Sequence, residues 1–592
     1  MPVTASTAFP ALPRVDGLPH TPFTFPSHTS AVAMPGFFPC FLSLLFLLLH
    51  SLLVAGSPDD TVVVTSSGPI KGKKVTTDSG TVTAYLGIPY AEPPLGELRF
   101  QKSRPHQPWN DVLEVTSFGN SCPQRKVSNN IIPDGGAWAV NTPLSEDCLF
   151  LNLWVPQQSE PAPVLVWIHG GGFVSGTASL DLYNGAMFAA TEKVIVASIN
   201  YRLGLLGFLY LPPAAPGNVG LWDQHLAVTW VKENAAAFGG DPDLLTLLGH
   251  SAGAASVGFH LLSPASQPLF ARAVLQSGAP NAPWAWQSPE QAKENALKLG
   301  RSLSCTQEDH SAVVSCLQKK AYEEIDFDSF TYLFGTTTDG DFLLDEPQKL
   351  IKAGRIQGKP VLTGVTADEG SAMVFYLFPD SIADGTVVTQ EQLLEGMRKY
   401  MRGAAESAIE ALALKYVEDD DSPGRYSRAM AQLSRDNEFV CPMTDFAAKL
   451  VEAGSPVYAY FFTHYTSGSL WPEWAGVTHG AEVPYLFGTI ASVQKEGQSY
   501  TDEEDALNGR VMRYWASFAR SWQPTESFPT EEPWPLYDAA KQNFYRISTE
   551  SPEVVQKSPA QRCDFLATHN SNSEKDFVSP EKEEDGKHET RM

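Results

Sequence analysis

The chain has 592 residues and a formal net charge of −25 at pH 7, and 43% of its residues are hydrophobic. So negative a charge argues against binding to nucleic acid and to anionic membrane surfaces. It is compatible with cationic ligands, and equally with an acidic surface that only keeps the protein soluble. The apolar content suffices for a large core, and no internal repeat or long linker divides the chain.

The N-terminal segment has the pattern of a secretory signal peptide. Residues 37–56 form an apolar run that ends in small residues, and we expect cleavage near residues 55–57. An uncleaved signal anchor is the alternative, because the run is close to the length that crosses a bilayer. We assign residues 1–57 to an extension and signal peptide, residues 58–569 to one folded domain, and residues 570–592 to a disordered charged tail. The mature chain is expected to be secreted and to have no stable membrane span.

Six cysteines remain once the signal peptide is removed: Cys122, Cys148, Cys305, Cys316, Cys441 and Cys563. An even number of cysteines in a secreted chain predicts disulfides, although the sequence alone does not select one pairing. None has the paired spacing of a zinc site, and we expect neither a metal nor a cofactor.

Apolar runs between turn residues predict strands, and helical spacing predicts helices between some of them. Residues 87–94 form a Pro-rich stretch that we expect to be a loop. The spacing of the apolar residues predicts helices at residues 222–238 and 252–262. Strands that alternate with helices predict an α/β doubly wound fold with sites at the carboxyl ends of the strands. The predicted strands are residues 61–65, 81–86, 145–154, 163–168, 194–201, 244–248, 273–278, 359–365 and 456–462.

Three consecutive glycines follow the predicted strand at residues 163–168, within the sequence His-Gly-Gly-Gly-Phe at 169–173. Backbone N–H groups of glycines can turn towards a reacting oxygen, as in the oxyanion hole of acyl-transfer enzymes. A flexible loop is the alternative interpretation.

A Gly-x-Ser-x-Gly sequence at residues 249–253 joins a predicted strand to a predicted helix. A serine on such a turn has an exposed hydroxyl, so Ser251 is the candidate nucleophile, with an ordinary loop serine as the alternative. Its base and acid should follow in the order serine, acid, histidine, which favours Glu369 and His479. Asp368 competes with Glu369 as the acid. His250 is a poor candidate for the base, because a neighbour on a sharp turn points elsewhere.

The chain from about residue 61 to residue 566 resembles the type-B carboxylesterase/cholinesterase family of the α/β-hydrolase fold, whose central sheet is mostly parallel with helices on both faces. The motifs that carry the resemblance are at residues 87–91, 145–149, 169–173, 200–204, 251–257 and 368–370. Residues 277–284 and 471–474 resemble the cholinesterase branch in particular.

The resemblance implies a catalytic triad of Ser251, Glu369 and His479. It also implies an oxyanion hole formed by the N–H groups of Gly171, Gly172 and Ala252. The disulfides that it implies are Cys122–Cys148, Cys305–Cys316 and Cys441–Cys563.

The resemblance further implies a set of substrate-binding residues. Trp138 is similar to the cholinesterase tryptophan that holds a quaternary ammonium group by a cation–π contact. Phe330 and Tyr332 fall near the acyl-pocket aromatics of that branch. Trp284 is the last residue of the branch-specific motif at residues 277–284. We also count His250 among the substrate-binding residues, because its position borders the alcohol-binding region of the family. Glu482 is not part of this set and matches a buried family carboxylate.

Two departures from the family pattern bear on specificity. His250 stands where the family usually has Glu, and Ala372 stands where acetylcholine-selective members have an aromatic residue. Both weaken the case for choline as the alcohol part of the substrate. We expect a serine hydrolase that cleaves small-molecule carboxylic esters through an acyl-enzyme intermediate, with possible choline ester activity. A broad-specificity carboxylesterase and a non-catalytic adhesion or binding protein are the alternatives, and a monomer or homodimer is expected.

Overall fold

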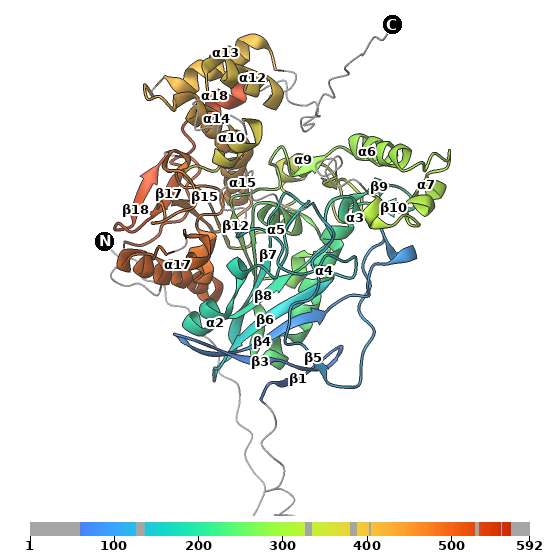
Figure 1. The fold of residues 1–592 in the computed structure, drawn as a ribbon. Helices are drawn as coiled ribbons and strands as arrows, with labels where there is room; N and C mark the ends of the chain where they lie inside the picture. Colours follow the sequence, from blue (N-terminus) through green and yellow to red (C-terminus); the bar gives the residue numbers. More distant parts are fainter. Residues whose placement is uncertain are drawn as a thin grey trace, which may run out of the picture. The chain divides into compact units, whose positions relative to one another are not determined.

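An eleven-stranded sheet organises the chain (Figure 1). The seven strands from β17 to β8 run parallel, and the outer strands pair antiparallel. In spatial order the strands are β18 (Glu553–Gln556), β17 (Asn543–Ile547), β16 (Val457–Phe462), β15 (Val361–Thr366), β12 (Arg272–Gln276), β11 (Gly240–His250), β7 (Ala162–Ile168), β8 (Ile195–Ile199), β6 (Phe150–Pro156), β4 (Gly80–Pro89) and β3 (Lys73–Thr77).

The computed structural model describes residues 60–569, apart from residues 126–135, 326–333, 379–387, 402–403, 419, 496, 527–531 and 558. The predicted signal peptide and charged tail lie outside the described residues. So do Phe330 and Tyr332, whose place in an acyl pocket therefore stays a prediction.

The central strands are apolar throughout because both faces of the sheet are covered. On β7, Val164 and Val166 belong to one core, whereas Leu165 and Trp167 belong to the core on the opposite face. The first core also contains residues of α3 (Gly204–Phe208), α4 (Val219–Asn234), α5 (Ala252–Leu262), α6 (Pro289–Ser302), α7 (His310–Leu317), α9 (Pro347–Lys352) and α15 (Cys441–Glu452). The predicted α/β architecture is confirmed.

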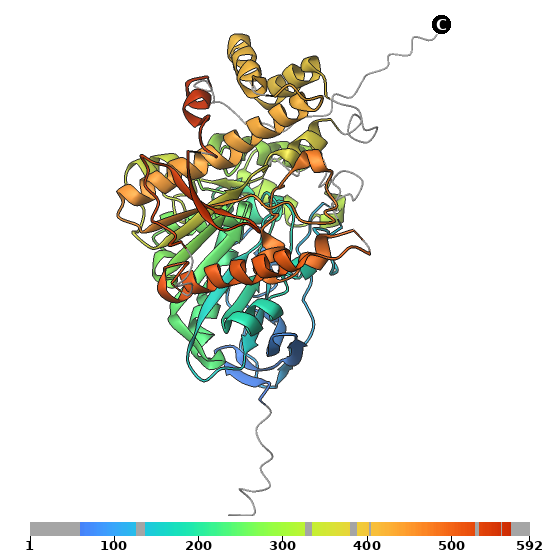
Figure 2. The same ribbon diagram turned by 90° about the vertical axis from the view of Figure 1, so that its left-hand side faces the viewer.

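The opposite face of the sheet is covered by α2 (Ala186–Glu192), α16 (Val483–Phe487) and α17 (Asp502–Ser521). Figure 2 shows α17 as the long red-orange helix in front of the green strands. A separate apolar cluster joins α10 (Ser371–Leu377), α12 (Gln390–Tyr400), α13 (Glu406–Val417), α14 (Arg425–Arg435) and α18 (Cys563–His569).

Short strands lie outside the main sheet. They are β1 (Val62–Thr65), β2 (Gly68–Lys71), β5 (Leu113–Glu114), β9 (Tyr210–Leu211), β10 (Ala215–Pro216), β13 (Trp286–Gln287) and β14 (Thr336–Thr337).

Several sequence predictions need correction at element boundaries. The helix expected at residues 222–238 is α4, which begins at Val219 and ends at Asn234, and the strand expected at residues 244–248 is the longer β11. Residues 87–89 are not a loop but the end of β4, because the strand continues after a register shift between Tyr85 and Ile88. Gly87 lies inside this bulge at φ +77°, and its N–H donates to Asn152 Oδ1 at 2.9 Å. The strand expected from residue 145 begins only at Phe150.

Three disulfides are present among the described residues: Cys122–Cys148, Cys305–Cys316 and Cys441–Cys563, which join cysteines 26, 11 and 122 residues apart. This is the pairing that the family resemblance implies. The third disulfide fixes the start of α18 to the start of α15. Within the part of the chain that the structure describes, none of the helices combines the length and the apolar character needed to cross a bilayer.

Candidate active site

Ser251 occupies the sharp turn between β11 and α5, which begins and ends as the sequence predicts. Its backbone has φ +58° and ψ −122°, a conformation that is strained for a residue with a side chain. The turn is held on both sides, because Ser251 N donates to Gln276 O at 2.8 Å and Ala255 N donates to Ser251 O at 2.9 Å. The surrounding structure therefore imposes the strain at Ser251.

The two glycines of the motif are required by close packing around the turn. A Cβ on Gly249 would lie 2.3 Å from the carbonyl oxygen of Gly253. A Cβ on Gly253 would lie 1.9 Å from the carbonyl oxygen of Ile168, at the end of β7. A side chain at Gly249 would push β11 away from the start of α5, and one at Gly253 would push the turn away from β7.

The glycine loop after β7 lies against the serine. A Cβ on Gly170 would be 2.9 Å from Ser251 Cβ, and Gly171 and Gly172 adopt φ +112° and φ +61°. Among the described residues, the N–H groups of Gly171, Gly172 and Ala252 donate no hydrogen bond. Unpaired N–H groups on residues beside a serine are what an oxyanion hole requires.

His169 holds this loop and is not a candidate base. Its ring stacks on Tyr201 with 4.5 Å between centroids, and Tyr201 donates its hydroxyl to His169 O at 2.9 Å. Burial lowers the pKa of His169 to about 4, so the ring is neutral at physiological pH. The neutral ring then donates from Nδ1 to Gly170 O at 2.8 Å.

Glu369 and His479 form a hydrogen-bonded pair, although they are 110 residues apart in the sequence. His479 Nδ1 donates to Glu369 Oε2 at 2.5 Å, and Thr366 N donates to Glu369 Oε1 at 2.7 Å. The Glu369 side chain is fully buried, whereas the His479 side chain is 21% exposed. Because both carboxylate oxygens are engaged, the carboxylate orients the imidazole and leaves Nε2 available.

Asp368, the competing acid, has a different task. Its Oδ2 accepts from Val477 N at 2.9 Å, and its own N–H donates to Val477 O at 2.9 Å. Burial raises the pKa of Asp368. A Cβ on Gly476 would lie 2.1 Å from Asp368 Oδ2. Asp368 therefore anchors the loop that carries His479, and Glu369 is the acid in contact with the imidazole.

No hydrogen bond joins Ser251 Oγ to His479 in this structure. The histidine nevertheless meets the nucleophile strand through His250, whose ring centroid lies 4.4 Å from that of His479. Catalytic hydrogen bonds are often long before substrate binds and shorten in the complex.

His250 is buried beside an aromatic surface, with 2% of its area exposed. Its ring centroid lies 6.0 Å from that of Trp138, and a Cβ on Gly480 would be 2.9 Å from Trp138 Cη2 and 3.1 Å from His250 Cε1. Neither ring nitrogen of His250 has a hydrogen-bond partner among the described residues. Burial, and then the charge on His479, lowers the pKa of His250 well below its usual range, so this ring is neutral.

Phe439 is a site residue that no sequence motif indicated. It lies on the π-helix η7 (Asp436–Val440), and its ring centroid is 4.6 Å from that of His479. Trp284 lies behind it, with 6.1 Å between ring centroids, and donates Nε1 to Glu438 O at 3.0 Å. Trp284 thus supports the residue that contacts His479. The π-helix η7 is a single turn between α14 and α15, and such turns inside longer helices often mark functional sites. Its presence is not readable from the sequence.

A second buried carboxyl lies behind the acid. Glu482 Oε1 accepts from Tyr460 Oη at 2.9 Å and from Gln276 Nε2 at 3.1 Å, and its Oε2 has no partner among the described residues. Burial, and then the charge on Glu369, raises the pKa of Glu482. The described residues contain no group of three His, Cys, Asp or Glu side chains that could hold a metal ion.

Comparisons with known proteins agree with this site. The model of the carboxylesterase family matches residues 59–566. The chain is 40% identical over 543 residues to a cholinesterase of Mus musculus, which covers 89% of each protein. It is also 40% identical over 549 residues to an acetylcholinesterase of Bungarus fasciatus, which covers 90% of each protein.

Proposed function

The chain belongs to the carboxylesterase family and is a serine hydrolase of small-molecule carboxylic esters, and we propose that Ser251, His479 and Glu369 carry out its reaction. The observation that carries this assignment is the strained Ser251 turn, flanked by unpaired N–H groups and faced by the Glu369–His479 pair.

Acylation begins when Ser251 Oγ attacks the ester carbonyl carbon while His479 Nε2 takes the hydroxyl proton. Glu369 stabilises the imidazolium that forms, because its carboxylate stays ionised and its Oε2 accepts a hydrogen bond from Nδ1–H. The imidazolium then gives its proton to the alcohol oxygen, and the C–O bond to the alcohol breaks. A water deprotonated by His479 attacks the acyl-enzyme, and Ser251 leaves with its proton restored.

The carbonyl oxygen becomes negative in both tetrahedral intermediates. We assign the N–H groups of Gly171, Gly172 and Ala252 to that oxygen. Each donor of such a hole is typically worth about 3 kcal/mol of barrier. Because these groups donate to no described residue, they are free for the oxyanion without any rearrangement.

The alcohol side of the site favours neutral groups over cations. Trp138 could hold a quaternary ammonium group by a cation–π contact. Its neighbour His250 is a neutral imidazole and supplies no negative charge there. We therefore place the chain closer to a carboxylesterase of broad specificity than to an enzyme selective for choline esters.

A pair of substitutions at His250 separates charge from shape. We expect His250→Glu to raise the ratio of kcat/KM for acetylthiocholine over that for 3,3-dimethylbutyl thioacetate, its neutral isostere. The rise should be about tenfold, as about 1.4 kcal/mol of added attraction would give. His250→Gln, which has the same shape without the charge, should leave this ratio unchanged. An equal effect of both variants would contradict the electrostatic explanation.

We also propose that the protein is secreted after cleavage of its signal peptide. The three disulfides support this, because such bonds form and persist in oxidising compartments. N-terminal sequencing of the protein from culture medium tests the cleavage near residues 55–57, and sedimentation equilibrium tests the predicted monomer or homodimer.

Ser251→Ala tests the assignment of the nucleophile. We expect kcat for a neutral acetate ester to fall by about a million-fold, since the triad acts as a unit. Ser263→Ala is the matched control, because Ser263 is a buried serine that ends the same helix and its hydroxyl has no partner among the described residues. If Ser251→Ala kept the activity of this control, the assignment would be wrong.

A further inference from the structure

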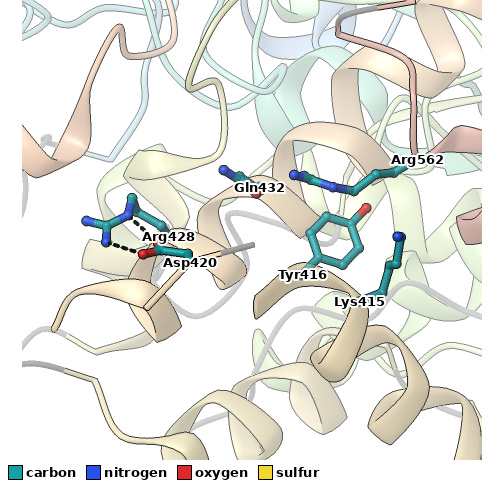
Figure 3. Close-up of a pocket in the computed structure, with 6 residues that line it drawn as sticks. All are labelled: Lys415, Tyr416, Asp420, Arg428, Gln432 and Arg562. Atoms are coloured by element: carbon teal, nitrogen blue, oxygen red, sulfur yellow. Dashed lines mark hydrogen bonds and ion pairs between the residues drawn. The ribbon is translucent and has the colours of Figure 1, made fainter. Parts of the chain in front are cut away.

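A second pocket lies outside the ester site, between α13, α14 and the turn before α18 (Figure 3). Its volume is about 370 Å³, which is within the range of small-molecule sites. None of its lining residues belongs to the triad or to the glycine loop. The lining residues are Lys415, Tyr416, Asp420, Arg428, Gln432 and Arg562.

Three of these six side chains are cationic and one is acidic, in a chain whose net charge is −25. Arg428 is neutralised within the pocket, because Nε and Nη2 donate to the two oxygens of Asp420 at 2.8 and 3.1 Å. Lys415 pairs with the exposed Glu418 just outside the lining. These contacts leave Arg562 as the cation with the least compensation.

The Arg562 guanidinium has only a distant carboxylate partner. Its Nη1 lies 3.6 Å from Asp436 Oδ2, and this nitrogen is buried and makes no hydrogen bond to any described residue. Asp436 is already engaged, because Arg435 Nε donates to Oδ1 and Tyr416 Oη donates to Oδ2, each at 2.8 Å. One carboxylate therefore serves two guanidinium groups and a phenol.

The neighbourhood holds Arg562 in place. The next residue, Cys563, is bonded to Cys441, and the guanidinium lies over the Tyr416 ring at 4.8 Å from the centroid. The Gln432 carboxamide also lines the pocket and has no hydrogen bond to any described residue. A preorganised guanidinium and a free amide are donors that suit the oxygens of a carboxylate, phosphate or sulfate.

We propose that this pocket binds a small oxyanion-bearing ligand. The Arg562 guanidinium and the Gln432 amide contact the oxyanion, and Lys415 supplies further positive charge in the lining. The volume leaves room for an organic group attached to the anionic head.

Inorganic phosphate is the probe for this site. Urea unfolding of the whole protein is followed in rising phosphate, with sodium chloride added to hold the ionic strength constant. A ligand that binds the folded state raises the folded-to-unfolded ratio by the factor 1 + [L]/Kd, so about 20 Kd of phosphate should raise it about 20-fold. Acetate and sulfate, tested in parallel, distinguish the head group. Equal stabilisation by chloride alone would overturn the proposal.

Variants assign the effect to the pocket. We expect Arg562→Gln and Gln432→Glu each to raise the Kd for phosphate at least tenfold. Gln432→Glu acts by charge repulsion and keeps the side-chain volume. Lys415→Gln should raise this Kd less, and its matched control is Lys352→Gln, which removes the same charge from the last turn of α9. If Arg562→Gln does not fold, phosphate binding by Gln432→Glu still tests the proposal. Wild-type phosphate binding by Gln432→Glu would refute the proposal.

Discussion

Glu438 is a buried acid whose replacement should stabilise the protein in a pH-dependent way. It lies on the π-helix η7 with 5% of its area exposed, and Ser434 Oγ donates to its Oε2 at 2.8 Å. Burial raises the pKa of Glu438 from its ordinary 4.5 to about 6, an effect partly offset by hydrogen bonding to Tyr400 and Ser434 and by the charge on His479. The folded state therefore holds this proton more tightly than the unfolded chain does.

The size and the sign of the change in unfolding free energy follow from this pKa difference of about 1.5. At 1.36 kcal/mol per unit, ionised Glu438 costs about 2 kcal/mol of folding free energy. Below about pH 4.5 Glu438 is protonated in the folded and in the unfolded state, so its burial imposes no ionisation cost. As the pH rises through about 6 the buried carboxyl must ionise, and the folded state loses stability relative to the unfolded chain. Glu438→Gln is neutral at every pH and keeps an acceptor for Ser434. The variant should therefore match the wild type near pH 4 and exceed its stability by about 2 kcal/mol at pH 7.5.

Urea unfolding of the oxidised protein, repeated between pH 4 and pH 8, measures this difference. The exposed Glu410→Gln, on α13, is the matched control for loss of one carboxylate. A difference between Glu438→Gln and wild type that stays constant over the whole pH range would refute the reasoning. So would a wild type that gains stability relative to the variant as the pH rises.

Two further predictions concern the glycine loop and the disulfides. Gly170→Ala should lower kcat about a hundredfold or more with a smaller change in KM. The reason is that the alanine Cβ would lie 2.9 Å from Ser251 Cβ and displace the glycine loop. Steady-state kinetics measures both constants, and an unchanged kcat would contradict the prediction. Replacing Cys441 and Cys563 by Ser should cost about 5 kcal/mol, as expected for a loop of 122 residues. Urea midpoints of oxidised wild type and double variant measure this cost, and a loss below about 1 kcal/mol would contradict it.

The nucleophile turn could be predicted because its determinants are local. An apolar strand, two glycines around Ser251 and an Ala-rich helix follow one another in the sequence, and α5 has the predicted bounds. The choice between Asp368 and Glu369 could not be made in this way. Both neighbours carry a carboxylate, and the partner that distinguishes them, His479, is brought to Glu369 from 110 residues away by the tertiary structure.

Other parts of the site carry no sequence signal. Phe439 and Glu438 lie in the π-helix η7, which carries no sequence motif. The contact of Phe439 with His479 is made in the tertiary structure, where α15, which continues η7, packs against β16. The pocket around Arg562 likewise depends on a disulfide that brings the C-terminal helix to α15. Local patterns therefore predict the candidate reacting groups, whereas the surroundings of these groups are visible only in the fold.

Covalent labelling tests the central claim most directly. The protein is treated with an excess of a small organophosphate, and its peptides are then analysed by mass spectrometry. If Ser251 is activated by His479 and Glu369, one adduct per chain should form, on the peptide that contains Ser251, and none should form in Ser251→Ala. An adduct on another residue, or equal labelling of wild type and Ser251→Ala, would contradict the account.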